Sequence, residues 1–375
     1  MQKLAIIGAS YLQQPLVQRA KDMGLYTICF AWTDGAVCRD VADKFYPISI
    51  IEKEQILDIC RRERIDGICT IASDVAAPTV AYIAEQMGLD GNTYECALRA
   101  NNKYLMRQAF STAGVPCPKY VCMERGKGGD ENMYGIEFPV IVKPSDRSGS
   151  MGVVKIEKKE DLLAAIKVAQ DYSFTHQAMV EQFVDGREIS VEFISYQGKH
   201  YPLQITDKIT TEEPHFVELE HHQPADLTSA QYDEIYAITQ RALTALGITN
   251  GASHSEYRIT KDGKIYVMKI GARRGGDFIG SDLVQLSTGY DFLRGVIEVA
   301  LGQFHEPQLT EHNYSGVYFL SEKTAHLKPI IEQHTLPQIV KTEITDNALH
   351  PLTCSGDRSG YLIYKANEKL EIKKF

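Results

Sequence analysis

Several features are scarce or missing in this 375-residue sequence, and each absence excludes a class of protein. No apolar run approaches the ~20 residues that cross a bilayer, so we expect no membrane span and no membrane partner. The formal net charge is −9, so the chain lacks the basic field that attracts nucleic acid. The eight cysteines include no CxxC pair, which argues against metal or disulfide use. The first residues have no signal-peptide layout, and we expect a cytoplasmic protein.

Length and patterning predict the fold class. A chain of 375 residues is long for one hydrophobic core, which favours two or three domains. Residues 1–95 alternate short apolar runs with helical patterns, which predicts a parallel sheet covered by helices on both faces. The apolar runs are Leu4–Ile7, Tyr26–Phe30 and Gly67–Thr70, and the helical patterns are Leu12–Met23, Glu54–Arg64 and Val75–Met87.

The first turn of this region, Gly8-Ala9-Ser10, argues against a dinucleotide site. It lacks the GxGxxG spacing, so a bound NAD and a Rossmann oxidoreductase are disfavoured. Ligands in such sheets bind at the carboxyl ends of the strands, which makes Ser10 and the pair Ser73 and Asp74 candidate small-molecule contacts. Capping of the helices that follow is at least as good an interpretation of these residues.

The rest of the chain mixes strand and helix patterns. We expect helices at 101–114, Lys159–Tyr172 and about Ala230–Leu246, the last with a capping box of Thr228 and Gln231, and strands at Met179–Phe183 and Glu188–Ile194. Thr206–Pro224 is predicted to be an irregular polar segment. Residues 306–375 are predicted to form a small β-rich domain.

A loop that is rich in small residues follows a short apolar strand at Val140–Gly152. The strand ends at Lys143, and the loop contains Ser148, Gly149 and Ser150. Backbone N–H groups in such a loop form an anion nest, and a lysine adds a mobile positive charge, so the combination suits a polyphosphate. Taken alone, the loop is equally well explained as a hairpin turn.

Two further strands carry polar residues on one face only. Alternation places Glu188, Ser190 and Glu192 on one face of the first strand, and His254, Glu256 and Arg258 on one face of the second. The second strand continues into Asp262-Gly263, a strong hairpin signal. A two-residue turn would pair Lys261 with Lys264, Arg258 with Val267, Glu256 with Lys269 and His254 with Gly271. Opposed Cβ atoms lie about 5 Å apart, so we expect Glu256 and Lys269 to touch.

The second hairpin strand leads into a glycine-rich exit, Gly271–Asp277. Its guanidinium groups suit a carboxylate or a phosphate. Taken in chain order, these motifs resemble those of the ATP-grasp family, the ATP-dependent carboxylate–amine ligases. The resemblance implies that Lys103 and Lys143 contact phosphates and that the loop with Ser148 and Ser150 is a lid. It further implies that Glu181, Gln182, Phe183 and Val184 form the adenine hinge, that Glu188 binds ribose, that Glu256 binds magnesium, and that Arg273 holds the substrate carboxylate.

The resemblance also implies an architecture and a reaction. It implies a Rossmann-like α/β domain at 1–98, an ATP-grasp body of two α+β subdomains at 99–305 with its lid subdomain at about 115–185, and the small β-rich domain at 306–375. The reaction would use ATP and Mg²⁺ to convert a substrate carboxylate into an acyl phosphate, which an amine then attacks. A homodimer is the family expectation.

The sequence departs from this pattern at Lys269, where the family has a second metal-binding carboxylate, and at Gly271, where many members have Asn. We expect Lys269 to neutralise Glu256 and to repel a divalent ion, so that turnover is low or absent while ATP still binds. Lys269 therefore joins Lys143 and Arg273 among the candidate catalytic residues. A nucleotide-binding protein without catalysis is the alternative function, and Asp277 is a candidate substitute metal ligand.

The candidate substrate contacts come from several segments. They are Ser73, Asp74, Lys208, Glu218, His222, His254, Arg273, Gly275 and Asp277. The i, i+4 spacing of Glu218 and His222 raises a zinc site as a further alternative, but no third ligand is evident. A polar loop that packs over the cleft is the plainer interpretation of that segment.

Overall fold

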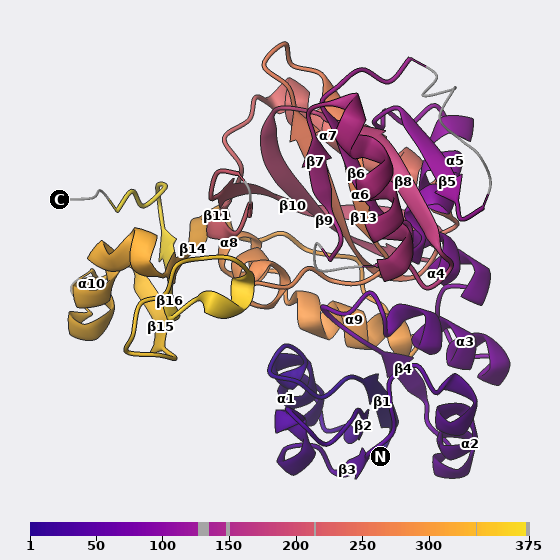
Figure 1. Cartoon of the computed structure of the whole chain (residues 1–375). Coiled ribbons are helices and arrows are strands. Elements are labelled where there is room, and N and C mark those ends of the chain that lie inside the picture. Colours follow the sequence, from indigo (N-terminus) through magenta and orange to yellow (C-terminus); the bar gives the residue numbers. More distant parts are fainter. Residues whose placement is uncertain (127–134, 148–150, 214, 335, 373–375) are drawn as a thin grey trace.

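The computed structural model describes residues 1–126, 135–147, 151–213, 215–334 and 336–372 (Figure 1). Its N-terminal region (residues 1–93) is built on a parallel sheet of order β3-β2-β1-β4, as the alternating pattern predicts. Its elements are β1 Lys3–Ile7, α1 Gln14–Asp22, β2 Tyr26–Phe30, β3 Lys44–Tyr46, α2 Lys53–Glu63, β4 Gly67–Cys69 and α3 Ala77–Met87. Helices α1 and α3 begin later than predicted, with a proline in each first turn.

The helix predicted at 101–114 is present, and a second helix that the sequence did not predict lies directly before it. They are α4 Tyr94–Asn101 and α5 Lys103–Thr112. The side chain of Asn102 separates them, because its Oδ1 accepts from the N–H groups of Tyr104 and Leu105 at 3.0 and 3.1 Å and so caps α5. Lys103 is therefore the first residue of α5.

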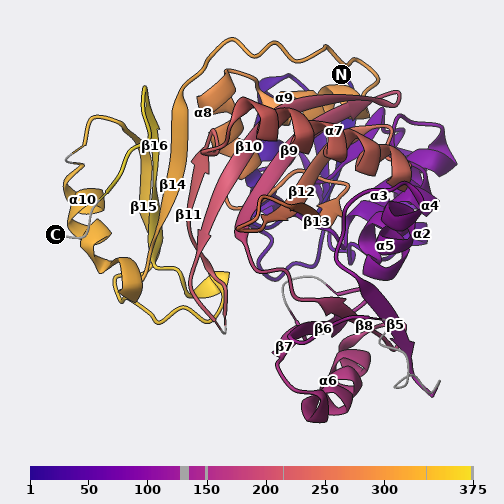
Figure 2. The same cartoon turned by 90° about the horizontal axis from the view of Figure 1, so that it is seen from above.

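A small antiparallel sheet of order β5-β8-β6-β7 follows, which we call the small sheet. Its strands are β5 Tyr120–Glu124, β6 Val140–Pro144, β7 Val154–Ile156 and β8 Gln177–Gln182, and α6 Lys159–Tyr172 covers one face. Figure 2 shows this sheet and helix as a separate layer beside the rest of the molecule.

The remaining strands form one large sheet of order β13-β12-β9-β10-β11-β14-β16-β15. They are β9 Arg187–Tyr196, β10 Lys199–Thr210, β11 Glu218–Gln223, β12 Gly251–Ile259, β13 Ile265–Gly271, β14 Tyr314–Leu320, β15 Ile339–Ile344 and β16 Gly360–Ala366. The helices are α7 Ser229–Leu246, α8 Val284–Thr288, α9 Phe292–Ala300 and α10 Lys328–Gln333, with shorter 3₁₀ and π turns at Val37–Asp40, Ile279–Leu283, Glu322–Leu327 and Ser355–Asp357. Within the described residues, none of the helices is long and apolar enough to span a bilayer.

Two sequence expectations change in this sheet. Thr206–Pro224 is only partly irregular, because it contains the end of β10 and all of β11, which pair antiparallel. Polar side chains on these strands concealed the alternation. The β-rich character predicted for residues 306–375 is present, and its strands extend the large sheet through the pairing of β11 with β14.

The β12–β13 hairpin differs from the predicted hairpin at two points, and the two register shifts compensate each other. The turn is longer than predicted, since the Thr260 N–H donates to the Lys264 carbonyl at 2.9 Å and Ile259 pairs with Ile265. A bulge between Glu256 and Tyr257 then restores the predicted register, so Glu256 still lies opposite Lys269 and His254 opposite Gly271. Arg258 pairs with Tyr266 instead of Val267.

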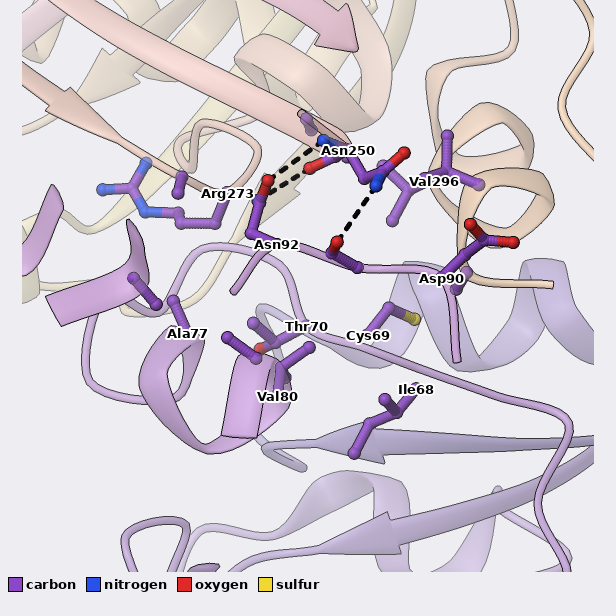
Figure 3. A pocket seen from close by; sticks show the side chains of 18 residues that line it. Ile68, Cys69, Thr70, Ala77, Val80, Asp90, Asn92, Asn250, Arg273 and Val296 are labelled. Carbon is purple, nitrogen blue, oxygen red and sulfur yellow. Dashed lines mark hydrogen bonds between the residues drawn. The ribbon is translucent and has the colours of Figure 1, made fainter. Parts of the chain in front are cut away.

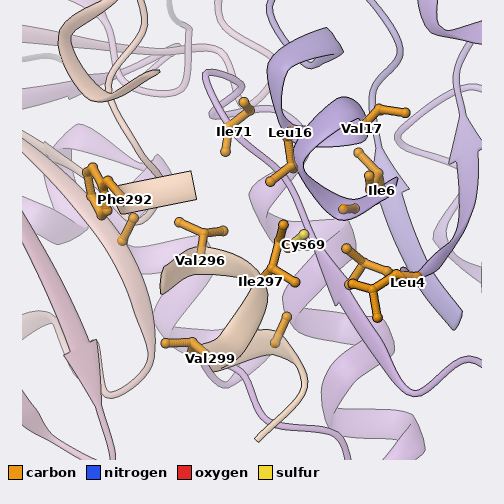
Figure 4. Close-up of a cluster of buried hydrophobic side chains, with 14 of the residues drawn as sticks. Leu4, Ile6, Leu16, Val17, Cys69, Ile71, Phe292, Val296, Ile297 and Val299 are labelled. Atoms are coloured by element: carbon orange, nitrogen blue, oxygen red, sulfur yellow. The ribbon is translucent and has the colours of Figure 1, made fainter. Parts of the chain in front are cut away.

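A shared hydrophobic core joins the N-terminal region to the large sheet. Helix α9 packs against β4 and α1, and its Phe292, Val296 and Ile297 belong to one buried cluster with Leu4, Leu16 and other residues of the N-terminal region (Figure 4). This packing fixes the carboxyl end of β4 next to β12 and β13.

A close backbone contact beside this core predicts a stability effect. A Cβ at Gly67 would lie 2.5 Å from the carbonyl oxygen of Ala300, which belongs to the backbone and cannot rotate away. Gly67→Ala should therefore lower the free energy of unfolding by about 2 kcal/mol, measured by urea denaturation. Gly356→Ala is the control, because its nearest neighbour would be the Cys354 sulfur at 3.5 Å. Equal stability of the two variants would contradict this account.

Candidate active site

The two polar strand faces predicted from the sequence lie side by side. Strands β9 and β12 pair antiparallel, with Glu188 opposite Arg258 and Glu192 opposite His254. The odd-numbered residues of β9 share a core with α7, so its even-numbered residues face the other way. They form one polar surface on the large sheet, which the N-terminal region and the small sheet border (Figure 2).

Lys143 lies in a buried charge cluster. It forms an ion pair with Glu181 of β8, and Arg107 of α5 lies 2.8 Å from the same carboxylate. Arg107 and Glu181 are 0% and 1% exposed. Burial is the main cause that lowers the pKa of Lys143, although Glu181 opposes it. Burial also disfavours the charge of Glu181, but Arg107 and Lys143 outweigh it and lower the pKa of that carboxyl. Arg107 was not predicted from the sequence, because it is 74 positions away from Glu181 in the chain.

Lys103 contacts the backbone that follows Lys143. Its ammonium donates to the carbonyl oxygen of Pro144 at 3.2 Å and to that of Arg147. Burial, reinforced by the nearby charges of Lys143 and Lys269, lowers the pKa of Lys103 to about 7. A lysine in this state would gain its full charge beside an anion.

Two backbone N–H groups of the predicted hinge form hydrogen bonds within the protein. The N–H groups of Gln182 and Phe183 donate to backbone carbonyls of the protein at 2.9 and 3.2 Å. Any adenine contact from this hinge therefore uses its other backbone groups, including those of Val184. Ser148 and Ser150, predicted in the lid loop, lie outside the described residues.

Glu188, the predicted ribose ligand, is paired with two cations. Its carboxylate lies 2.8 Å from Lys208 and 3.2 Å from Arg258. Lys208 also lies 3.5 Å from Glu218, so two predicted substrate residues meet here. Burial disfavours the charge of Lys208, but Glu188, Glu256 and Glu218 outweigh burial and raise its pKa. The polar surface therefore keeps a permanent ammonium at this point.

Arg358, which precedes β16, also reaches this surface, and no sequence pattern predicted it. Its guanidinium lies 2.9 Å from both Asp277 and Glu218, and 3.7 Å from the ring centroid of Phe319. The Nε2 of His221 lies 3.9 Å from Asp277. The carboxylate of Asp277 is thus committed to a cation, which argues against its predicted use as a substitute magnesium ligand.

His222 is on the wrong face for the predicted role. In the β10–β11 pairing His221 lies opposite Lys208, and alternation turns His222 away, where its Nδ1 lies 2.9 Å from the Tyr364 hydroxyl. This corrects His222 as a substrate contact and the Glu218–His222 zinc pair. Among the described residues, no group of three or more His, Cys, Asp or Glu side chains is arranged to hold a metal ion.

His254 and Glu256 are organised by a buried carboxylate. The Nδ1 of His254 bonds to Glu192, which is 0% exposed, and the Nε2 lies 3.6 Å from Glu256. Burial opposes protonation of His254, but Glu192 outweighs it and the pKa rises. Burial likewise opposes ionisation of Glu256, but nearby cations, His254 first, hold its pKa well below the usual range. Gly275 is required here, since a Cβ would lie 2.7 Å from His254 Nδ1.

The expected Glu256–Lys269 contact is replaced by a longer-range one. The Lys269 ammonium lies 2.5 Å from Asp74 of the N-terminal region, and the Arg273 Nε lies 2.7 Å from the other oxygen of that carboxylate. Burial disfavours charge on Asp74, but Arg273 and Lys269 outweigh it and hold its pKa below its usual range. Ser73 does not cap α3, whose N-cap is Ala76 without a side-chain cap; its hydroxyl accepts from the Ala76 N–H at 3.3 Å in the turn before that helix.

A cavity of about 70 Å³ lies where the N-terminal region meets the large sheet (Figure 3). Asn92 and Asn250 bridge it: Asn92 Nδ2 donates to the Asn250 carbonyl at 2.7 Å, and the Asn250 N–H donates back at 3.0 Å. The cavity meets the polar surface through Ala272 and Arg273, whose guanidinium points away from the two asparagines. It is therefore a neighbour of the charged cluster and separate from it.

The sequence of this chain is similar to those of known proteins. The ATP-grasp domain family matches residues 136–282. The chain is 32% identical over 199 residues to the D-alanine–D-alanine ligase of Lactococcus lactis subsp. lactis (strain IL1403), covering 46% of this chain and 52% of that protein. It is 28% identical over 245 residues to the alanine–anticapsin ligase of Bacillus subtilis (strain 168), covering 60% of this chain and 51% of that protein. The matches thus span about half the length of these relatives.

The whole fold has solved counterparts. The L-amino acid ligase from Bacillus licheniformis superposes with a TM-score of 0.80 at 23% identity, over 98% of this chain and 94% of that one. This likeness extends over the N-terminal region, the small sheet and the large sheet, beyond the segment that the family matches. The chain therefore contains an ATP-grasp domain at residues 136–282, and as a whole it has the fold of the solved L-amino acid ligase.

Proposed function

We propose that the chain is an ATP-dependent ligase that joins a small carboxylate, in the first place an amino acid, to an amine. The observation that carries this proposal is the convergence of Lys103, Arg273 and Glu256. Asp74 and Lys269 influence the charge of Lys103, while Asp74 and Glu256 influence that of Arg273, so these groups share one neighbourhood. Amino-acid substrates are supported by the names of the relatives.

The residue chemistry suits acyl-phosphate formation. A carboxylate oxygen would bond to the γ-phosphorus of ATP while the bond to ADP breaks. The amine would then attack the acyl carbon, lose a proton and release phosphate. The first step brings two anions together, so it needs positive charge at the site. Lys103, Lys143 and Arg273 supply that charge from three different elements.

Glu256 is the residue that would hold Mg²⁺. Magnesium at nucleotide sites is bound through one or two carboxylates together with phosphate oxygens and water, so a single ionised carboxylate fits that requirement. Glu256 meets it, because neighbouring cations hold its pKa well below the usual range. When bound, the ion would neutralise charge on the phosphates.

A nucleotide-binding protein without turnover is the second candidate function. Lys269 favours it, because this residue is paired across the hairpin with Glu256 and contributes positive charge there. The Lys269–Asp74 ion pair weakens this candidate, since it gives the ammonium a partner other than Glu256.

Phosphate release from ATP tests the proposal. With Mg²⁺ and pairs of amino acids, ADP should form only when both substrates are present. Glu256→Gln should lower the rate at least about 100-fold, since a bound metal supplies several kcal/mol of charge stabilisation. The exposed Glu54→Gln on α2 is the control. ATP-dependent thermal stabilisation without ADP formation, with turnover appearing only in Lys269→Glu, would establish the second candidate instead.

A further inference from the structure

The end of β13 forms a small receptor for a carboxylate. Lys269, Gly271 and Arg273 are alternate residues along the strand and its exit, and we call them the carboxylate cradle. Asp74 fills it, with Lys269 at 2.5 Å from one oxygen and Arg273 at 2.7 Å from the other. Asp74 is 8% exposed, so this contact is largely removed from water.

Gly271 shapes the cradle. A Cβ at this position would lie 2.9 Å from Asp74 Oδ1 and 3.2 Å from Arg273 Cζ. A side chain here would therefore push the carboxylate away from the guanidinium. The glycine, the ammonium and the guanidinium together match a planar carboxylate, since one oxygen meets each cation.

The occupant comes from a different part of the fold than the cradle. Asp74 follows β4 at the carboxyl edge of the N-terminal sheet, whereas the cradle belongs to the large sheet. Lys269 and Arg273 both pair with the single carboxylate of Asp74, and Glu256 adds a further negative charge near Arg273. The Lys269 ammonium also lies close enough to Lys103 to depress the pKa of that lysine, which places the cradle beside the candidate phosphate site.

We propose that Asp74 occupies the carboxylate cradle while no substrate is bound, that the substrate carboxylate displaces Asp74 on binding, and that Lys269 is a substrate-positioning residue. This rests on the proposed ligase function. Substrate binding then exchanges an internal ion pair for an equivalent one with the ligand. The apparent affinity is reduced by the fraction of molecules in which Asp74 fills the cradle.

Direct binding of two small probes tests this exchange. Propionate carries a carboxylate alone, and L-alanine carries a carboxylate and an ammonium. Asp74→Asn should bind both probes about tenfold more tightly, because the competing charge is gone. Lys269→Met should bind both more weakly, and Lys269→Arg should restore binding. Ligand-observed NMR measures each affinity without turnover, so an inactive protein would fail the ligase proposal and still report on the cradle.

A matched control separates exchange from loosening of the fold. Arg19 of α1 pairs with Asp291, which caps α9, and this ion pair also joins the N-terminal region to the large sheet. Arg19→Met should leave both probe affinities unchanged. Equal effects of Arg19→Met and Asp74→Asn would overturn the proposal, since Asp74 would then only join the two parts. Weaker L-alanine binding with unchanged propionate binding in Asp74→Asn would also overturn it, since Asp74 would then contact the ammonium.

Discussion

Glu181→Gln is expected to lower the free energy of unfolding by about 3–5 kcal/mol, the usual cost of removing one partner from a buried ion pair. The carboxylate is shared by Arg107 and Lys143, and Arg107 is fully buried. Lys143 can lose its proton when its partner is removed, because burial already lowers its pKa. Arg107 cannot, so its charge is left uncompensated. Far-UV circular dichroism during urea unfolding measures the change.

Two further variants check the cause of this loss. Arg107→Met in the Glu181→Gln background should recover part of the stability, because the unpaired charge is then removed as well. Glu213→Gln should have no measurable effect, since its pairing with Lys155 is half exposed. A Glu181→Gln protein as stable as the Glu213→Gln protein would show that the buried cluster contributes no net stability.

The sequence patterns predicted what depends on local alternation. Period-two alternation placed Glu188 and Glu192 on one face, and the pairing of β9 with β12 brought them opposite Arg258 and His254. The Glu256–Lys269 pairing was also predicted, although the turn and the bulge each differ by a residue and happen to compensate. Alternation is a property of the chain itself, so one sequence is enough to find it.

The partners of these charges could not be predicted in the same way. Arg107 and Arg358 reach the site from other elements, and no local period marks them. Asp74 was a candidate contact from its place after β4, but its pairing with Lys269 and Arg273 was not predicted. Their positions depend on how α5, β4 and the segment before β16 pack against the large sheet. The prediction for His222 was wrong because β11 and its pairing with β10 were not recognised, and the alternation of side chains along a strand could not be applied to it. Long-range packing, which residue spacing does not encode, decides which ionic groups meet.

Lys103 is expected to make nucleotide binding depend on pH. Its pKa is lowered to about 7, first by burial and then by Lys143 and Lys269, with Glu181 and Asp74 acting in the opposite sense. A bound phosphate would raise that pKa, so binding would take up a proton wherever the free protein has lost one. Affinity for ADP should therefore fall as pH rises above 7, by about 50-fold between pH 7 and pH 9, because about half of the Lys103 side chains are already uncharged at pH 7 and the slope approaches tenfold per unit only above it.

The origin of this pH dependence is testable because phosphate groups titrate lower. The last phosphate proton has a pKa of about 6, so the charge of the nucleotide changes little between pH 7 and pH 9. Lys103→Arg stays charged throughout and should bind ADP with a flat profile, and Lys103→Met should bind weakly with a flat profile. Calorimetry in buffers of different ionisation enthalpy should show proton uptake near pH 8 for the unaltered chain alone. Because the pKa of Lys103 depends on the charges around it, Lys269→Met should move the onset of the pH dependence upward. A pH-independent affinity in the unaltered chain would mean that Lys103 is charged before the nucleotide arrives, and that the phosphates meet a fixed cation there instead of creating one.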